Sequence, residues 1–214
     1  ATGSSQVELC PVNCLSGRPG GGDGQLAAPP SVPVDPTDDS VLVADSNNSR
    51  IQRLTMDGTY VEMYGWGTGG VNLSNPTDVA ADAAGNLFVA SIGTDQIVKI
   101  DAAGVLVTTW GGTGGQPGQF SGPHGVAVNS SGSVFVADMN NTRIQKFDND
   151  GRLLTMWGRN GSDPGEFGSP TELSALHENI WVFDTTGRIQ VFGDTVLFDG
   201  FESGDVSYWT ATVP

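Results

Sequence analysis

Cysteine and histidine, the side chains that most often hold metals or act as nucleophiles, are scarce in this chain. Its 214 residues include two cysteines and two histidines. Cys10 and Cys14 lie in the segment CPVNC, and no second Cys or His pair lies at the spacing of a zinc site. Cys-x-x-Cys-His is absent, so no c-type haem is predicted. We predict a disulfide between Cys10 and Cys14, with two reduced thiols as the alternative; a disulfide fits an oxidising compartment.

The sequence contains no set of residues suited to nucleophilic catalysis. A hydrolase needs a nucleophile, a base and a group that orients the base. The motifs Gly-x-Ser-x-Gly and His-Glu-x-x-His are both missing. We therefore predict no catalytic residue, no metal ligand and no cofactor, and we expect a protein that is not an enzyme.

Acidic and basic residues recur in pairs along the chain. An aspartate precedes an arginine by four or five residues three times, in the pairs Asp45 and Arg50, Asp138 and Arg143, and Asp184 and Arg188. A carboxylate and a guanidinium on either side of a tight turn pair well and fix its geometry. Because a catalytic site does not repeat at intervals along a chain, we interpret these pairs as scaffold.

Five Asn-x-Ser/Thr sequons are candidate glycan acceptors on surface turns. They begin at Asn47, Asn72, Asn129, Asn140 and Asn160. Asn, Ser and Gly are also the residues that turns prefer for conformational reasons, which is the alternative interpretation.

The chain is strongly acidic, with a net charge of −15 from 24 acidic and 9 basic residues. Such a surface repels phosphate backbones and anionic lipids, so nucleic acid is excluded as a partner. No apolar stretch approaches the ~18 residues of a membrane span, so no membrane insertion is predicted. Because the first residue is Ala1 rather than Met, we expect a processed chain, either after removal of a secretory signal or after trimming. We predict an extracellular or cell-surface location.

Two columns of residues recur at the same period. Four prolines are spaced 47 residues apart, namely Pro29, Pro76, Pro123 and Pro170. A second column is spaced by 46 or 47 residues and contains Asp45, Ser91, Asp138 and Asp184. A period of 40–50 residues is typical of propellers and solenoids.

Each repeat reads as four short strands. In residues 123–158, GVAVN, VFVAD, RIQKF and RLLTMWG are separated by turn residues, and apolar residues do not recur at helical spacing. The predicted unit is a four-stranded antiparallel meander that buries its two faces by radial stacking. Two columns are predicted to form the core between sheets: Val43, Val89, Val136 and Val182, and Ile51, Ile97, Ile144 and Ile189. We expect Trp66, Trp110 and Trp157 to pack between sheets as well.

The segment GQFSGPHGVAVNSSGSVFVADMNNTRIQKFDNDGRLLTMWG closely resembles the NHL repeat. The resemblance covers about residues 24–200 as four units, and the second unit has Ser91 and Gln96 where the others have Asp and Arg. It implies an all-β β-propeller of four NHL-type four-stranded antiparallel blades, either a closed small ring or an open fan, whereas NHL propellers usually have six blades. We expect an N-terminal extension at 1–23, the propeller at 24–201 and a tail at 202–214. The ending DGFESGD is similar to tails of secreted bacterial proteins.

Some NHL propellers are enzymes, which supplies an alternative function. In the amidating lyases of this family several histidines hold zinc, and His124 lies at one such ligand position. The matching positions hold Pro30, Thr77 and Thr171, and the second histidine, His177, lies in a turn. Two histidines cannot complete a three-histidine site. Some family members bind RNA through a basic face, which this chain lacks.

A second question concerns the expected channel of the propeller. Asp78 and Glu172 are expected near its mouth, at the positions of Ser31 and Gly125 in the other units. Two carboxylates there would suit a cation, although ordinary turn chemistry is the favoured interpretation. The acidic turns DPTDDS and DNDG lack the ligand spacing of an EF-hand.

We predict a secreted, non-catalytic structural or interaction module that self-assembles through its terminal segments, into extracellular filaments if the contact does not close on itself. SSQVEL near the N-terminus and TVLFDGF at 195–201 both have strand character. The expected partners are further copies of the chain, as a homo-oligomer or homopolymer, or other extracellular proteins or glycans. A metal-dependent lyase and a propeller that binds a glycan or small ligand are the alternatives.

Overall fold

The computed structural model describes residues 18–65, 67–176 and 179–193. In these residues the regular elements are β-strands and three single turns of 3-10 helix, so the predicted all-β class is confirmed. The three turns are η1 (Ser46–Asn48), η2 (Thr68–Gly70) and η3 (Met139–Asn141).

Strands β3 to β16 form four antiparallel sheets, each made of strands that are consecutive in the chain, and β1 (Arg18–Pro19) and β2 (Gln25–Leu26) form a separate parallel pair before them. The first sheet contains β3 (Val41–Asp45), β4 (Arg50–Leu54) and β5 (Tyr60–Gly65). The second contains β6 (Pro76–Ala81), β7 (Leu87–Ser91), β8 (Gln96–Ile100) and β9 (Leu106–Gly111). The third contains β10 (Pro123–Val128), β11 (Val134–Asp138), β12 (Arg143–Phe147) and β13 (Leu153–Trp157). The fourth contains β14 (Pro170–Leu176), β15 (Asn179–Asp184) and β16 (Ile189–Gly193).

The first and fourth sheets differ from the predicted four strands, because each has three in the described residues. In the first sheet, residues 31–34 run beside β3 and accept hydrogen bonds from Leu42 N–H to Pro33 O (2.9 Å) and from Ala44 N–H to Ser31 O (3.1 Å). Pro33 has no N–H to donate, so the ladder stays incomplete. The segment TVLFDGF, which follows β16, lies outside the described residues.

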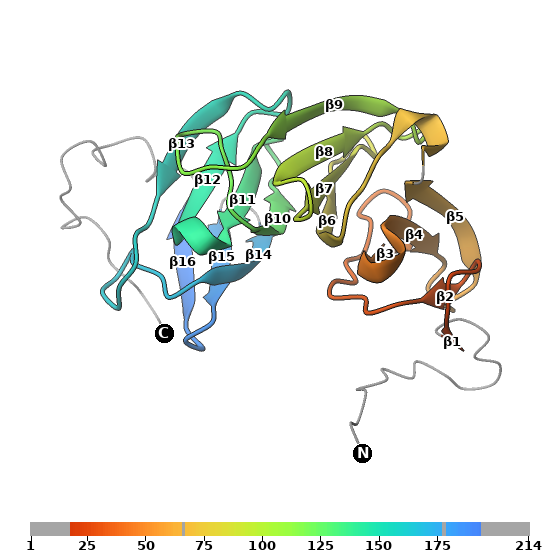
Figure 1. Cartoon of the computed structure of the whole chain (residues 1–214), viewed down its shortest axis with the longest axis horizontal. Helices are drawn as coiled ribbons and strands as arrows, with labels where there is room; N and C mark the ends of the chain where they lie inside the picture. The colour runs from red at the N-terminus through yellow and green to blue at the C-terminus, as the bar shows by residue number, and fades with distance from the viewer. Residues whose placement is uncertain (1–17, 66, 177–178, 194–214) are drawn as a thin grey trace, which may run out of the picture.

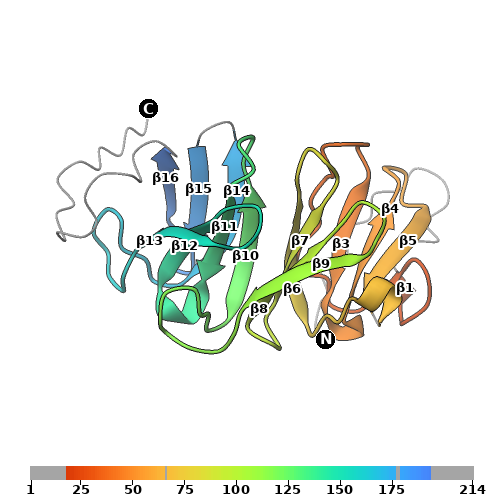
Figure 2. The same cartoon turned by 90° about the horizontal axis from the view of Figure 1, so that it is seen from above.

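The four sheets follow one another in chain order (Figure 1, Figure 2). A hydrophobic cluster lies between each successive pair and holds the sheets together. A closed ring of four sheets needs a fourth cluster between the fourth and first sheets, and the described residues contain none. The sheets therefore form an open fan. Figure 1 shows it as an arc that ends at β14–β16 on one side and at β3–β5 on the other.

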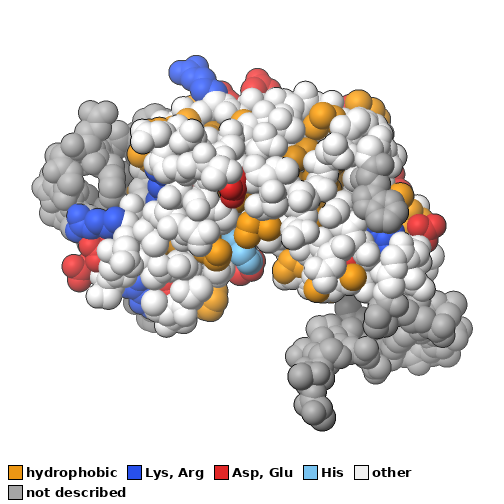
Figure 3. All heavy atoms as spheres, viewed as in Figure 1, with side chains coloured by type: hydrophobic (Ala, Val, Ile, Leu, Met, Phe, Trp, Pro, Cys, Tyr) orange, Lys and Arg blue, Asp and Glu red, His pale blue; other side chains and the backbone are white. Residues whose placement is uncertain are grey.

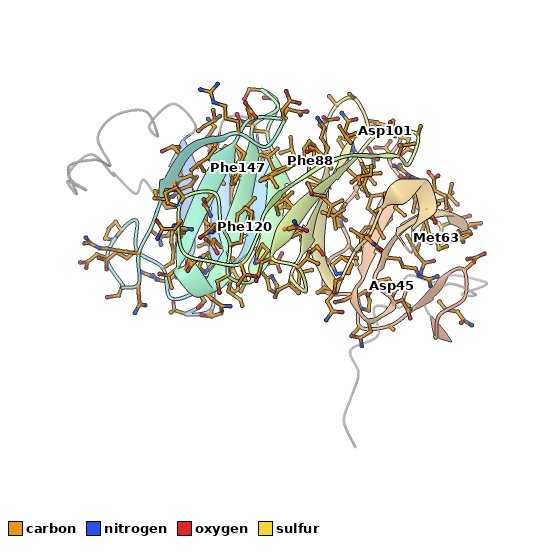
Figure 4. The ribbon with its side chains drawn as sticks, turned by 45° about the horizontal axis from the view of Figure 1, so that its top comes forward. Asp45, Met63, Phe88, Asp101, Phe120 and Phe147 are labelled. Atoms are coloured by element: carbon orange, nitrogen blue, oxygen red, sulfur yellow. The ribbon has the colours of Figure 1, made fainter. Side chains whose placement is uncertain are left out.

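Aromatic rings fill the clusters. Between the second and third sheets, Phe147 lies 5.7 Å from Phe120 and 5.8 Å from Trp110, measured between ring centroids (Figure 4). Trp157 takes the same role one sheet later, 5.5 Å from Phe192. The packing role predicted for these two tryptophans is thus confirmed, whereas Trp66 lies outside the described residues. In the first sheet the residue paired with Ile51 is Tyr64, whereas the second and third sheets have tryptophan at this position.

Candidate interaction surface

One face of the fourth sheet is apolar and exposed. Because side chains alternate along a strand, β15 buries Ile180 and Val182 against the third sheet and turns Trp181 and Phe183 outward. We call this outward side the forward face; its members are Glu172, Ser174, Leu176, Trp181, Phe183, Ile189 and Val191. A hollow of about 420 Å³ lies on it and is lined mainly by these residues. The last sheet of the fan is therefore apolar on both sides.

The same positions are fully buried in the preceding sheets. Trp181 is 42% exposed, whereas Phe88 and Phe135 in the matching positions are 0% exposed. Ile189 is 62% exposed, whereas Ile97 and Ile144 are 0% exposed. The prediction that Ile189 is core is therefore wrong. No sheet packs against it in the described chain, although its strand has the same pattern as the buried ones.

The other end of the fan exposes part of the opposite half of such a core. We call the side of the first sheet that points away from the second sheet its rear face. On it, Val32 is 56% and Val34 is 52% exposed, whereas Val79 and Val126, in the position of Val32, are 1% and 2% exposed. The exposed part lies along residues 31–34, since Val43 on the same face is buried. Figure 3 shows hydrophobic side chains on both sides of the notch at the lower edge of the molecule.

The repeated Asp–Arg pairs hold the loops that join the sheets. Arg143 lies 2.7 Å from Asp138 and donates hydrogen bonds to the carbonyls of Gly115, Gln116 and Gln119. Arg50 pairs with Asp45 at 2.8 Å in the first sheet (Figure 4 labels Asp45). Arg188 pairs with Asp184 at 2.9 Å in the fourth sheet. These groups are part of the scaffold, as predicted.

The aspartate in the fourth sheet is held as a carboxylate. Burial raises the pKa of Asp184, but hydrogen bonds from the Thr186 hydroxyl, the Gly168 N–H and Arg188 outweigh it and lower this pKa to about 2. The second sheet has no such clamp, because Ser91 replaces the aspartate; its hydroxyl instead donates to Ser74 O at 3.1 Å. The loop before the second sheet accordingly takes a different path, through η2.

The acidic residues considered for a cation site, Asp78 and Glu172, lie in β6 and β14, the first strands of the second and fourth sheets. Asp78, 5% exposed, accepts hydrogen bonds from the N–H groups of Val79 (2.9 Å) and Val126 (2.8 Å) and from the Ser31 hydroxyl. Burial, opposed by these bonds and reinforced by the charge of Glu172, raises the pKa of Asp78 to about 7. Its oxygens thus serve to join three sheets. Within the described residues, no group of three His, Cys, Asp or Glu side chains is arranged to hold a metal.

His124 lies in β10, near Glu172 of β14. Its Nδ1 is 3.0 Å from Thr171 O and 3.9 Å from Glu172 Oε1. Its imidazole thus bridges the third and fourth sheets. The second histidine, His177, lies outside the described residues.

The candidate modification sites differ in exposure. Asn47, Asn72, Asn140 and Asn160 are exposed. Asn129 is 6% exposed, and its side-chain oxygen accepts hydrogen bonds from Ser131 and Ser133, so it is the least accessible of the five. Cys10 and Cys14 lie outside the described residues. In the described part of the chain no helix is long and apolar enough to cross a bilayer.

Sheets of antiparallel meanders packed face to face in an arc define a β-propeller-like fold. Residues 120–147 match the NHL repeat family. The chain therefore contains an NHL repeat in a propeller-like arrangement of four sheets, and the resemblance found in the sequence is confirmed.

Solved structures share this fold. A chain of a nidogen/laminin complex aligns with a TM-score of 0.62 at 18% identity, covering 81% of this chain and 63% of that one. Hydrazine synthase from Kuenenia stuttgartiensis gives 0.60 at 12% identity, with 80% and 47% covered. Virginiamycin B lyase from Staphylococcus aureus gives 0.53 at 17% identity, with 78% and 55% covered. No curated protein sequence matches the chain.

These likenesses, all below 25% identity, establish the fold alone. The chain spans between 47% and 63% of the length of these three structures. The forward face was not identified from the sequence. The signal for it was NIWVFD, a strand whose large apolar residues fall on both faces.

Proposed function

We propose that this protein is a non-catalytic, extracellular structural module that assembles with further copies of itself, the forward face of one copy packing on the rear face of the next. The observation that carries the proposal is the exposure of Trp181, Phe183 and Ile189. The positions they occupy are fully buried in the sheets before them. A contiguous apolar surface of this kind marks an interaction site.

A second copy is the occupant that fits both ends. The forward face is one half of the core that recurs between the sheets, and Val32 and Val34 are the exposed part of the other half, so the two ends of the fan complement each other. The forward face carries one charged residue, Glu172, which limits the desolvation cost of burying it. A large apolar side chain contributes about 1.5–3 kcal/mol when it is fully buried. These side chains are roughly half exposed, so burying the exposed part at the contact adds about half of that amount for each.

A contact between unlike faces is head-to-tail. Such contacts produce a ring if the rotation between copies closes and a filament if it does not. We propose that the assembly is a filament, because a head-to-tail contact can add further copies without closing into a ring. A chain that stays monomeric would instead favour other extracellular proteins or glycans as partners.

The test compares two pairs of serine substitutions. We expect the wild-type chain to form assemblies that grow with concentration by size-exclusion chromatography with light scattering and appear as oligomers or fibres in negative stain. W181S with F183S is expected to elute as a monomer. V107S with L154S, which changes exposed apolar residues outside the forward face, is the matched control and should still assemble.

Two results would overturn the proposal. One is a wild-type chain that stays monomeric at every concentration. The other is assembly that the forward-face pair leaves unchanged, since the contact would then lie elsewhere.

A further inference from the structure

The first strands of neighbouring sheets are joined by a contact that recurs along the fan. The hydroxyl of Thr77 in β6 donates to the carbonyl of His124 in β10 at 2.8 Å. The Nδ1 of His124 lies in turn 3.0 Å from the carbonyl of Thr171 in β14. Each step covers 47 residues, so each side chain reaches the backbone of its own counterpart in the next sheet. This contact fixes the register between one sheet and the next.

The neighbouring position makes a second contact across the same joint. The carboxylate of Asp78 in the second sheet accepts a hydrogen bond from the N–H of Val126 in the third at 2.8 Å. In the third sheet this position is Gly125, where a β-carbon would lie 2.6 Å from Thr171 O and 3.2 Å from Glu172 Cα. Glycine permits this close approach of two backbones. The first strands therefore nearly touch where one sheet meets the next.

The fourth sheet has the same two positions without a following sheet in the described residues. Thr171 and Glu172 occupy them in β14. The Thr171 hydroxyl lies 3.5 Å from Phe183 O of its own sheet. The side chain of Glu172 is 50% exposed, whereas Asp78 is buried. A hydroxyl donor and a carboxylate acceptor thus lie on the side where a further sheet would pack.

The first sheet has the complementary groups at the other end of the fan. Pro30 and Val32 hold the positions that His124 and Val126 hold in the third sheet. Within the described residues, the carbonyl of Pro30 accepts no hydrogen bond and the N–H of Val32 donates none. Both residues are exposed. The acceptor and the donor that receive a preceding sheet are therefore present and unused.

We propose that the Thr171 hydroxyl of one copy donates to the Pro30 carbonyl of the next, while the Glu172 carboxylate accepts a hydrogen bond from the Val32 N–H. This inference rests on the proposed self-assembly and specifies the register of its contact. One Glu172 oxygen lies 3.9 Å from His124 Nδ1, which leaves the second oxygen for this bond. The first sheet of the next copy is then placed as a fifth sheet would be.

A disulfide between two variants tests this register. Position 172 of one copy faces position 31 of the next, as Gly125 faces Glu172 within the fan. The approach of 3.2 Å at that internal joint suits a disulfide, whose β-carbons lie about 3.5–4.5 Å apart. One full-length variant carries E172C and the other S31C, so the two introduced thiols can join only across two copies.

Under mild oxidation we expect the mixture of E172C and S31C to form covalent dimers in a non-reducing gel. Mass spectrometry should identify the peptide pair that joins the two introduced thiols. Each variant alone controls for cross-links through Cys10 or Cys14 and should give background only.

The register control replaces S31C by V34C. Val34 is exposed and lies three residues further along the same segment, about 10 Å away in an extended chain. The mixture of E172C and V34C should also give background only. Preferential cross-linking of V34C would overturn the proposed register.

A second variant tests the hydrogen bond without changing the first sheet. T171A is expected to weaken association about 2- to 10-fold, the effect of losing one hydrogen bond. Sedimentation velocity over a concentration series measures it. T109A removes an exposed hydroxyl from β9 in the second sheet and is the matched control, which should associate as the wild-type chain does. Unchanged association of T171A would reject the bond to Pro30.

The outcomes separate the two proposals. Assembly of the wild-type chain, with only background cross-linking between E172C and S31C, would reject this register and leave self-assembly in place. A wild-type chain that stays monomeric at every concentration would reject both.

Discussion

Asp78 joins three sheets through one buried carboxylate. Its partners Ser31, Val79 and Val126 belong to the first, second and third sheets. Burial is the main reason that its pKa rises to about 7, far above the ordinary value of an aspartate. The folded chain thus binds a proton in a pH range where the unfolded chain has already released it.

This difference predicts that stability falls as pH rises from about 4 to about 7, because the folded state holds more protons there than the unfolded state. The slope approaches ~1.4 kcal/mol per pH unit for one fully shifted group. Urea unfolding of the monomeric W181S/F183S variant at pH 5, 6, 7 and 8 measures it. Adding D78N should flatten the profile over this range. The carboxyl of Asp184, with a pKa of about 2, titrates below the range and does not contribute. An unchanged slope in D78N would assign the effect to another group.

The strands of the four sheets share a pattern but not an environment. Phe135 in β11 and Trp181 in β15 hold matching positions. Phe135 is buried in the third cluster, with its ring centroid 6.3 Å from that of Trp157. Trp181 has no sheet in front of it within the described chain. The energetic role of the position is therefore set by the element that packs on it.

Alanine substitution should separate the two residues. F135A is expected to lower the free energy of unfolding by about 3–5 kcal/mol, because it leaves a cavity in a fully buried core. W181A should lower it by less than ~1 kcal/mol in the monomer, as is usual for exposed positions. Both are measured by chemical denaturation at a concentration where light scattering shows monomers. Equal losses would mean that the forward face is covered within a single chain.

The whole molecule carries a net charge of −15, so two copies repel each other at long range. The proposed contact is apolar and does not depend on ion pairs. Salt shortens the Debye length from about 30 Å at 0.01 M to about 8 Å at 0.15 M and screens the repulsion.

Association should therefore strengthen as NaCl is raised from 0.01 M to 0.15 M. Sedimentation velocity over a concentration series provides the measurement, and W181S/F183S, monomeric at both salt levels, is the control. Assemblies that dissociate as salt rises would instead indicate an interface held by charge pairs.

Much of the fold was predictable because the information is local. The alternation in VFVAD, the turn residues after it and the 47-residue period define the strands and sheets without reference to distant contacts. The roles of Asp138 and Arg143 followed from their repetition. The incomplete inner strand of the first sheet was less evident, although Pro33 indicates it.

The sequence by itself determined that meanders recur and that their apolar faces stack. The tertiary structure decided that the fan is open in the described part of the chain and that Ile189 is exposed while Ile144 is buried. The reason is physical: the two isoleucines lie in strands of the same local pattern. Burial depends on whether another sheet lies in front, which is a property of neighbours in space.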